Sequence, residues 1–545
     1  MINLSLDIII RNGKIIDGTG NSGYRADIGI SYGKIMRIKP YLYLKAEKEI
    51  DASNHIVCPG FIDIHSHTDF ILPFYSRMDS TIRQGITTTV TGMCGQGLAP
   101  VPAEKMDEFK RIFSDYIPLG MDITINWQTF EEYLDKMEKR RCPGNLAFSV
   151  GYSNIRIAGG QGFENRPPTD KEVKKMKEYL REAMEAGAFG LSTGLIYAPQ
   201  VFASTKEIIK LAKVVAEYNG LYFSHIRNEG ENVVNAVKEF IEIVEKSGCA
   251  GGQIAHHKVA GKIYWGASKE TLSLIEEANA RGISITCDQY PYRRGMSTLV
   301  TALPPWIHEG GTEKILERLK NPKDRKKIKK DIENGIEGWE NWIRDNGFDH
   351  IYVSLTKTDK WRDVKGKNIS EITKLKGMAD DWETLFEMLI DENTAIPVTI
   401  ESQGEDDIRR IMKSKYQMFG TDGMGIPRIS ALPALHPRFY GVYPRAIEKY
   451  VREEGILTME EAIRKMTSFP AQRLGLKDRG ILAEGMCADI VVFNPEIIKD
   501  NATYLDTHQY PDGIPYVIVN GTIVVDNGKQ LRKYPGIVLR RLSSK

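Results

Sequence analysis

The chain has 545 residues, of which 41% are hydrophobic and 27% charged, and its formal net charge is +2 at pH 7. This composition is typical of a globular protein, and the length predicts two or more packing units rather than one compact core. The near-neutral charge gives no reason to expect nucleic acid as a partner. No apolar stretch approaches the roughly 20 residues that span a bilayer, so no membrane association is expected.

The N-terminal segment and the cysteines bear on where the protein works. Residues 1–14 carry charges inside an apolar run and no small-residue cleavage site, which predicts a strand rather than a signal peptide. The six cysteines, at positions 58, 94, 142, 249, 287 and 487, show no disulfide spacing. We therefore expect a cytoplasmic protein in which each cysteine is a buried small hydrophobe or a ligand.

Both ends of the chain are predicted to form short β-strands. Residues 1–57 contain a two-residue hairpin signal at Asn12-Gly13. Residues 475–545 repeat the pattern, with a second such signal at Asn520-Gly521. We expect the two ends to assemble one small β domain.

Residues 58–474 alternate amphipathic helices with short apolar strands, which is typical of βα units and a parallel sheet. Four of these helices are expected at residues 171–187, 206–220, 232–248 and 268–282. Successive strands each end in a polar residue. This favours an α/β fold with a closed (β/α)8, TIM-like barrel over a doubly wound sheet, whose chemistry gathers at one switch point. Charged helices over about residues 308–390 indicate a helical insertion that ends before the apolar run Ala395–Ile400.

An apolar strand at residues 61–64 ends in the sequence His65-Ser-His67. Residues two apart in a strand point to the same side, so the two imidazoles are expected to converge. Converging imidazoles suit one divalent ion such as zinc. The motif therefore predicts two metal ligands at the start of the barrel.

Four further residues of the metal-binding types stand at predicted strand ends. Cys94 follows a β-branched run, and a thiolate in such a place binds zinc well. His225 and His256 end two strands about thirty residues apart, and Asp422 ends the last predicted strand. A carboxylate at that position can bind metal and act as a general base. Together with His65 and His67, these residues are hard to explain as core packing.

Ten stretches between residues 59 and 493 carry a resemblance to a known family: PGFIDIHSHTD, QGITTTVTGMCG, GLSTGLIYAP, SHIRNEG, QIAHHK, DQYPY, LPPWIHEGG, GTDG, HPRFYG and GILAEGMCADIVVF. The sequence resembles the N-acyl-D-amino-acid deacylases (D-aminoacylases) of the amidohydrolase superfamily. The resemblance implies zinc-dependent hydrolysis of the amide bond of an N-acyl-D-amino acid, which releases a carboxylate and a D-amino acid.

The resemblance also implies a role for each site residue. Cys94, His225 and His256 would hold one tightly bound zinc ion. His65 and His67, with Asp422, would form a second and weaker position, and Asp422 would carry the proton from water to the leaving amine. The residues that match those thought to bind the substrate carboxylate are Lys258 and Tyr290, with help from Arg438.

Some features depart from the family pattern or leave other functions open. Met93 replaces the usual asparagine, and Arg293 and Arg294 replace small residues, so at least one arginine could favour an acidic substrate. A dipeptidase that releases a C-terminal D-residue would use identical chemistry. A cyclic-amide hydrolase resembling dihydroorotase or hydantoinase is disfavoured, because residues 189–194 hold no bridging lysine. A non-catalytic scaffold is disfavoured by the complete ligand set.

Overall fold

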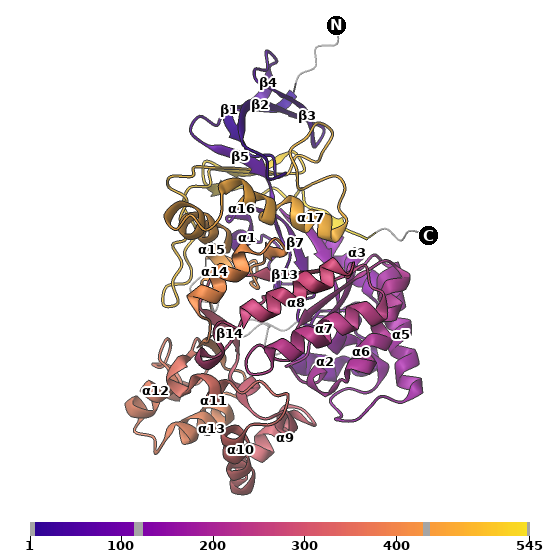
Figure 1. Cartoon of the computed structure of the whole chain (residues 1–545), viewed down its shortest axis with the longest axis vertical. Helices are drawn as coiled ribbons and strands as arrows, with labels where there is room; N and C mark the ends of the chain where they lie inside the picture. Colours follow the sequence, from indigo (N-terminus) through magenta and orange to yellow (C-terminus); the bar gives the residue numbers. More distant parts are fainter. Residues whose placement is uncertain (1–5, 114–123, 429–435, 542–545) are drawn as a thin grey trace.

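The computed structural model describes residues 6–113, 124–428 and 436–541. The chain forms an elongated molecule in which a β domain, a βα barrel and a helical insertion follow one another along the long axis (Figure 1). Among the described residues, no helix combines the length and the apolarity needed to cross a membrane.

Strands from both ends of the chain form one sheet, as the sequence predicts. The N-terminal strands are β1 (Leu6–Ile15), β2 (Tyr24–Ser31), β3 (Lys34–Lys39), β4 (Ala46–Asp51) and β5 (Ile56–Pro59). The C-terminal strands are β18 (Ile490–Phe493), β19 (Tyr516–Val519), β20 (Thr522–Asp526) and β21 (Lys529–Gln530). The two sets join where β5 pairs antiparallel with β18, with Cys58 opposite Val491. A core made mainly of isoleucines contains side chains from both sets of strands.

Only one of the two predicted Asn-Gly hairpins forms. Asn520-Gly521 joins the antiparallel strands β19 and β20, and both residues have positive φ, as a tight turn requires. The prediction for Asn12-Gly13 is wrong, because both residues lie inside β1 at a register shift. Asn12 uses its left-handed backbone (φ 63°) for a bulge there. A Cβ on Gly13 would lie 2.5 Å from Val57, so this bulge leaves room only for glycine.

The barrel consists of parallel strands in two sheets. One sheet has the order β17-β13-β12-β11-β10-β9, and the other contains β8, β7 and β6. The strands are β6 (Phe61–Asp63), β7 (Ile86–Thr91), β8 (Asn145–Phe148), β9 (Val150–Gly151), β10 (Gly190–Gly194), β11 (Leu221–His225), β12 (Gly251–Ile254), β13 (Ile285–Gln289) and β17 (Gln417–Phe419). β9 directly continues β8, and a parallel bridge from Ser66 to Gly423 links β6 to β17. These two connections close the expected (β/α)8 barrel.

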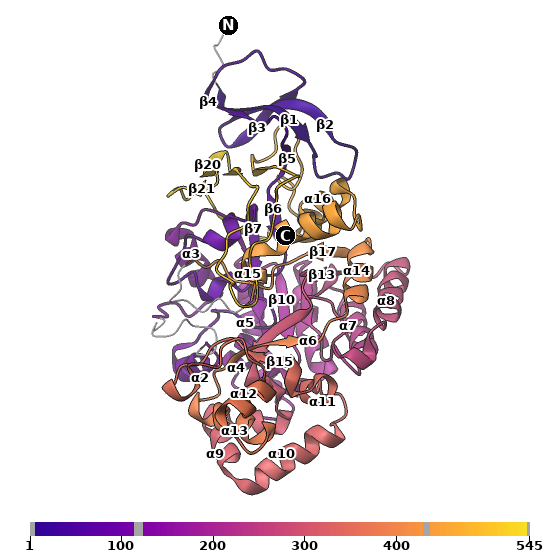
Figure 2. The ribbon, with the colours of Figure 1, turned by 90° about the vertical axis from the view of Figure 1, so that its left-hand side faces the viewer.

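Helices cover the outside of the barrel (Figures 1 and 2). The four expected helices are present as α5 (Asp170–Glu185), α6 (Thr205–Glu217), α7 (Val233–Ser247) and α8 (Ser268–Ala280). Other helices of this part are α1 (Asp79–Ile82), α2 (Met106–Phe113), α3 (Phe130–Arg140), α4 (Tyr152–Gly159), α14 (Glu405–Lys413), α15 (Arg438–Arg445), α16 (Met459–Met466) and α17 (Ser468–Leu474). The buried apolar faces of α6 and α7 pack toward the strands, which leaves the carboxyl ends of the strands free to build a site.

The insertion is larger than the predicted 308–390. It contains an antiparallel sheet of β14 (Arg294–Thr298), β15 (Ile351–Val353) and β16 (Pro397–Glu401), and its own hydrophobic core. Its helices are α9 (Thr312–Lys320), α10 (Pro322–Asn334), α11 (Trp342–Asn346), α12 (Ile369–Lys376) and α13 (Asp381–Asp391). The run Ala395–Ile400 therefore belongs largely to this small sheet, because β16 pairs with β14 and β15 and not with a barrel strand.

Candidate active site and metal centre

The six metal-ligand candidates gather at the carboxyl end of the barrel. His65 and His67 follow β6, and Cys94 follows β7. His225 is the last residue of β11, His256 follows β12 and Asp422 follows β17. All six side chains are buried. Parallel strands of a barrel end on one face, so residues far apart in sequence meet there.

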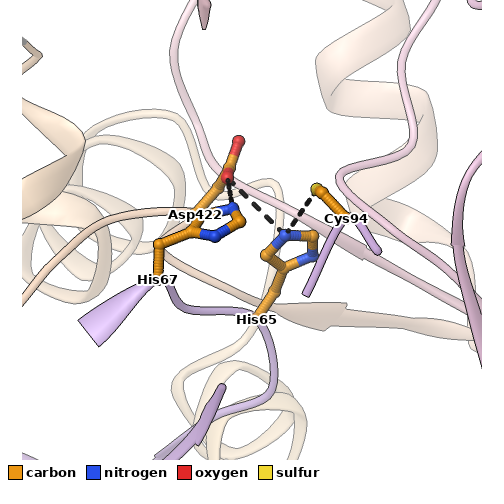
Figure 3. Close-up of side chains that lie close together, drawn as sticks. All are labelled: His65, His67, Cys94 and Asp422. Carbon is orange, nitrogen blue, oxygen red and sulfur yellow. Dashed lines mark hydrogen bonds and ion pairs between the residues drawn. The ribbon is translucent and has the colours of Figure 1, made fainter. Parts of the chain in front are cut away.

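The first cluster contains His65, His67, Cys94 and Asp422, whose candidate ligand atoms all lie within 4.8 Å of one another. Figure 3 shows the two imidazoles beside the Asp422 carboxylate and the thiol facing His65. Asp422 Oδ1 lies 3.1 Å from His67 Nε2 and 3.5 Å from His65 Nε2. Cys94 Sγ lies 3.4 Å from His65 Nε2.

The second cluster contains His225, His256 and again Cys94. Cys94 Sγ lies 3.5 Å from His256 Nε2, so the thiol is placed between the two clusters. Within the described part of the chain, Nδ1 of the buried His225 ring has no hydrogen-bond partner, and its Nε2 lies 3.5 Å from Glu229 Oε2. Buried polar atoms without a partner are costly unless another group binds them. Nitrogen, sulfur and oxygen donors in this arrangement fit zinc.

Three of the ligand candidates have left-handed backbone conformations. The φ angles are 53° at Cys94, 34° at His256 and 48° at Asp422. Such conformations cost roughly 1–2 kcal/mol for residues other than glycine, and they persist where the surrounding structure enforces them. At each of the three strand ends the chain therefore turns sharply, which directs the side chain into the barrel mouth.

Electrostatics keep the thiol and the carboxylate ionised. Burial opposes ionisation of Cys94, but the neighbouring His65 and His256 hold its pKa well below the usual value of a thiol. Burial likewise opposes ionisation of Asp422, but the Arg438 guanidinium and the histidines hold its pKa well below the usual value. A thiolate and a carboxylate are the forms that bind a metal.

Two buried carboxylates that the sequence reasoning missed support the imidazoles. Asp288 Oδ1 lies 3.2 Å from His65 Nδ1 and accepts a hydrogen bond of 2.7 Å from the His256 backbone N–H. Glu229 Oε1 lies 3.0 Å from His256 Nδ1. A carboxylate behind a histidine fixes its ring and leaves the other nitrogen for a metal. Asp288 stands at a strand end in the sequence, which was a usable signal, whereas Glu229 lies in a loop without one.

The three predicted substrate-binding residues lie together beside these clusters. Lys258 Nζ donates a hydrogen bond of 2.7 Å to Glu229 and lies 5.7 Å from the centre of the Tyr290 ring. Arg438 Nη1 lies 2.7 Å from Asp422 Oδ2, and its guanidinium lies 4.9 Å from the same ring. Tyr290 is thus flanked by two cations: Arg438, which pairs with the ligand candidate Asp422, and Lys258, which pairs with Glu229.

The main cavity lies over the clusters, between the barrel and the insertion. Its empty volume is about 1460 Å³, which includes open solvent at its mouth. Its lining includes Cys94, His225, His256, Asp422, Lys258, Tyr290 and Arg438. Its apolar lining comes from both parts of the molecule: Met296, Leu355, Pro397 and Ile400 of the insertion, and Ile71, Met424, Ile426 and Phe439 of the barrel. A polar reaction centre with apolar walls is typical of a small-molecule site.

Arg293 and Arg294, which replace small residues of the family pattern, do not line this cavity. Arg293 and Arg294 both pair with Glu401, at 3.2 and 3.6 Å. The Arg294 guanidinium also stacks over Tyr352, 3.6 Å from the ring centre. Their charge is therefore used to hold the insertion sheet, and it gives no support to the hypothesis of an acidic substrate.

Comparisons with known proteins agree with this geometry. The model of the amidohydrolase family matches residues 48–264 and 341–525. The N-acyl-D-glutamate deacylase of Alcaligenes xylosoxydans xylosoxydans is 34% identical, over 99% of this chain and 97% of that protein. The D-aminoacylase of the same organism is 30% identical, over 99% and 98% of the two chains.

Solved structures give the same result. The N-acyl-D-glutamate deacylase from Bordetella bronchiseptica, complexed with zinc and a phosphonate inhibitor, matches with a TM-score of 0.81 at 30% identity, over 98% of this chain and all of that chain. A D-aminoacylase structure matches with a TM-score of 0.80 at 30% identity and equal coverage. The sequence resemblance, the closed barrel and the two ligand clusters thus lead to one conclusion: the chain is a member of the amidohydrolase family and belongs to its D-aminoacylase branch.

Proposed function

We propose that this protein hydrolyses the amide bond of N-acyl-D-amino acids with the help of zinc and releases a carboxylate and a D-amino acid. The observation that carries the proposal is the pair of ligand clusters that share Cys94 at the floor of the main cavity. We also propose a cytoplasmic location, which the cysteine spacing supports.

Each ligand cluster has a proposed role in holding zinc. Cys94, His225 and His256 would hold the tightly bound ion, as the resemblance to the D-aminoacylases implies, with one thiolate and two imidazoles as donors. His65 and His67, with Asp422, would hold a second and weaker ion. Zinc bound at these residues makes a hydrolytic nucleophile available near neutral pH and polarises a carbonyl group.

Asp422 is proposed to carry the proton during hydrolysis. Its carboxylate takes a proton from the attacking water as the C–O bond forms at the carbonyl carbon. It then delivers that proton to the amide nitrogen as the C–N bond breaks, which yields a free amine and a carboxylate. Arg438 supports this role because its charge keeps Asp422 ionised before the reaction.

Lys258, Tyr290 and Arg438 are proposed to bind the substrate carboxylate. All three line the cavity next to the ligand clusters, and two of them are cations. A carboxylate fixed there would hold the neighbouring amide bond over the clusters, which lowers the entropic cost of reaction.

We expect Lys258→Met to lower kcat/KM for an N-acetyl-D-amino acid. The loss of transition-state stabilisation calculated from kcat/KM should be about 1.5–3 kcal/mol, the usual loss for a hydrogen bond to a charged group. The same substrate with an amidated carboxyl group should be poor for the wild type and little affected by the variant. Steady-state kinetics on both substrates check this, with Lys449→Met, a change in a lysine paired with Glu405 outside the cavity, as control. Equal hydrolysis of the acid and the amide by wild type would show that the carboxylate is not bound.

The proposal is tested by a panel of substrates offered to the purified zinc-loaded protein. We expect N-acetyl-D-amino acids to be hydrolysed faster than their L-enantiomers for several different side chains. The panel also contains L,D-dipeptides and hydantoins, which represent the two alternative enzyme classes. A general preference for L-substrates would contradict the proposal while leaving the barrel assignment intact.

The cyclic-amide alternative has little support in the site. β10 (Gly190–Gly194) contains no lysine, and the thiol of Cys94 stands between the clusters where a shared ligand is needed.

A further inference from the structure

A second cavity adjoins the main cavity on the side of β7 and β10. Its empty volume is about 700 Å³, which includes open solvent at its mouth. Gln96, Tyr197 and Thr298 line both cavities, so these three side chains form the boundary between them. The other walls come from two barrel loops, which contribute Phe163 and Ile196, and from the insertion, which contributes Val300, His308 and Ile315.

The side chains that the structure describes in the walls of this second cavity carry no formal charge. Among the described residues that line it there is no lysine, arginine, aspartate or glutamate. The titratable side chains among its described lining residues are Tyr197 and His308, and burial lowers the pKa of the His308 imidazole to about 4, so that ring is neutral at physiological pH. A charged group entering the cavity would lose its water without gaining a counterion, which is strongly unfavourable.

The boundary residues lie on the opposite flank of the metal ligands from the proposed carboxylate site. In the barrel sheet, β12 and β11 lie between β13 and β10. Tyr290 follows β13, and Tyr197 follows β10, with its ring 5.0 Å from that of His225. Gln96 comes two residues after Cys94. A substrate whose carboxylate lies at Tyr290 and whose amide lies over the ligands therefore points its acyl group toward Tyr197 and the second cavity.

We propose that the second cavity is an acyl-chain subsite that accepts the distal part of an uncharged, largely aliphatic acyl group. This inference rests on the proposed deacylase function and deepens it. It separates two substrate classes with identical chemistry at the amide bond: acyl groups with an uncharged distal end and acyl groups with a charged distal end. A linear acyl chain would bury its methylenes against Phe163, Val300 and Ile315, whereas a charged distal end would meet described walls that hold no residue of opposite charge.

The first test uses the zinc-loaded wild type and one D-amino acid, D-methionine, with different acyl groups. Burial of a methylene favours binding by about 0.8 kcal/mol, or roughly fourfold. We therefore expect kcat/KM to rise at least about tenfold from the acetyl to the hexanoyl derivative. The 6-aminohexanoyl derivative, which adds a terminal ammonium, should lose that gain. A hexanoyl derivative no better than acetyl, or a 6-aminohexanoyl derivative as good as hexanoyl, overturns the subsite.

The second test fills the cavity with Val300→Phe, since Val300 lines the second cavity and not the first. The variant should keep the acetyl activity within about twofold and lose the hexanoyl gain, because the acetyl group does not reach Val300. Val234→Phe, on α7 and outside both cavities, should keep the gain. A Val300→Phe protein that retains the gain contradicts the inference.

Absence of the subsite and absence of the proposed function would give different experimental results. If the acetyl derivative is hydrolysed but chain length has no effect, the subsite alone is wrong. If no N-acyl-D-amino acid of the substrate panel is hydrolysed, the proposed function is wrong and the subsite with it. A variant that does not fold is recognised by its loss of acetyl activity, and the wild-type comparison of hexanoyl with 6-aminohexanoyl then decides the question.

Discussion

Replacing Cys94 with alanine is expected to remove most of the bound zinc and most of the activity. The thiol belongs to both ligand clusters, so its loss weakens both at once. It also removes a negative charge that faces three buried imidazoles, His65, His225 and His256. Metal content of the purified variant and its kcat on an N-acetyl-D-amino acid are the measurements.

Two further variants test whether the effect is specific to Cys94. Cys142→Ala changes another buried cysteine that lies in neither cluster, and it should keep both zinc and activity. His65→Ala affects only one cluster, so it should retain zinc at Cys94, His225 and His256 while losing rate. A Cys94→Ala protein that keeps its full zinc content would show that the thiol is not a ligand.

Asp422→Asn should lower kcat by about 10²–10⁴-fold, the usual range for loss of general acid–base catalysis. The asparagine amide has nearly the same shape as the carboxylate but cannot accept a proton. The tight zinc should stay bound, because Asp422 does not belong to the cluster of Cys94, His225 and His256. Single-turnover kinetics together with metal analysis separate the two effects.

The matched control for this change is Asp407→Asn. Asp407 is also buried, but it lies on α14 and pairs with Arg410 outside both cavities. Its replacement should leave kcat nearly unchanged, whatever it does to stability. Near-normal kcat in Asp422→Asn would assign the proton transfer to another group.

The ligand candidates could be predicted from the sequence because each is a local signal. A short apolar strand followed by a histidine, cysteine or aspartate marks a residue at the barrel mouth, as His225 and Asp422 illustrate. The supporting carboxylates are harder to predict. Glu229 reaches His256 and Lys258 only through the fold, since 27 and 29 residues of chain separate these partners.

Other features could not be predicted from the sequence, because one local sequence pattern is compatible with two different structures. Asn12-Gly13 suits a left-handed turn, but the chain uses this conformation for a bulge within β1. The run at β16 is apolar because it is buried, and its burial in the insertion sheet looks the same in sequence as burial in a barrel. The second cavity has walls from separate segments of the chain, so no single motif predicts it.

The most direct test of the account is a zinc titration of activity with two enantiomers. The protein is stripped with a chelator, and hydrolysis of N-acetyl-D-methionine and N-acetyl-L-methionine is measured as zinc is returned. We predict that the stripped protein is inactive, that the first equivalent of zinc restores most D-specific activity, and that the L-enantiomer remains a poor substrate. Full activity in the stripped protein, or zinc-dependent hydrolysis that favours the L-enantiomer, would contradict the account.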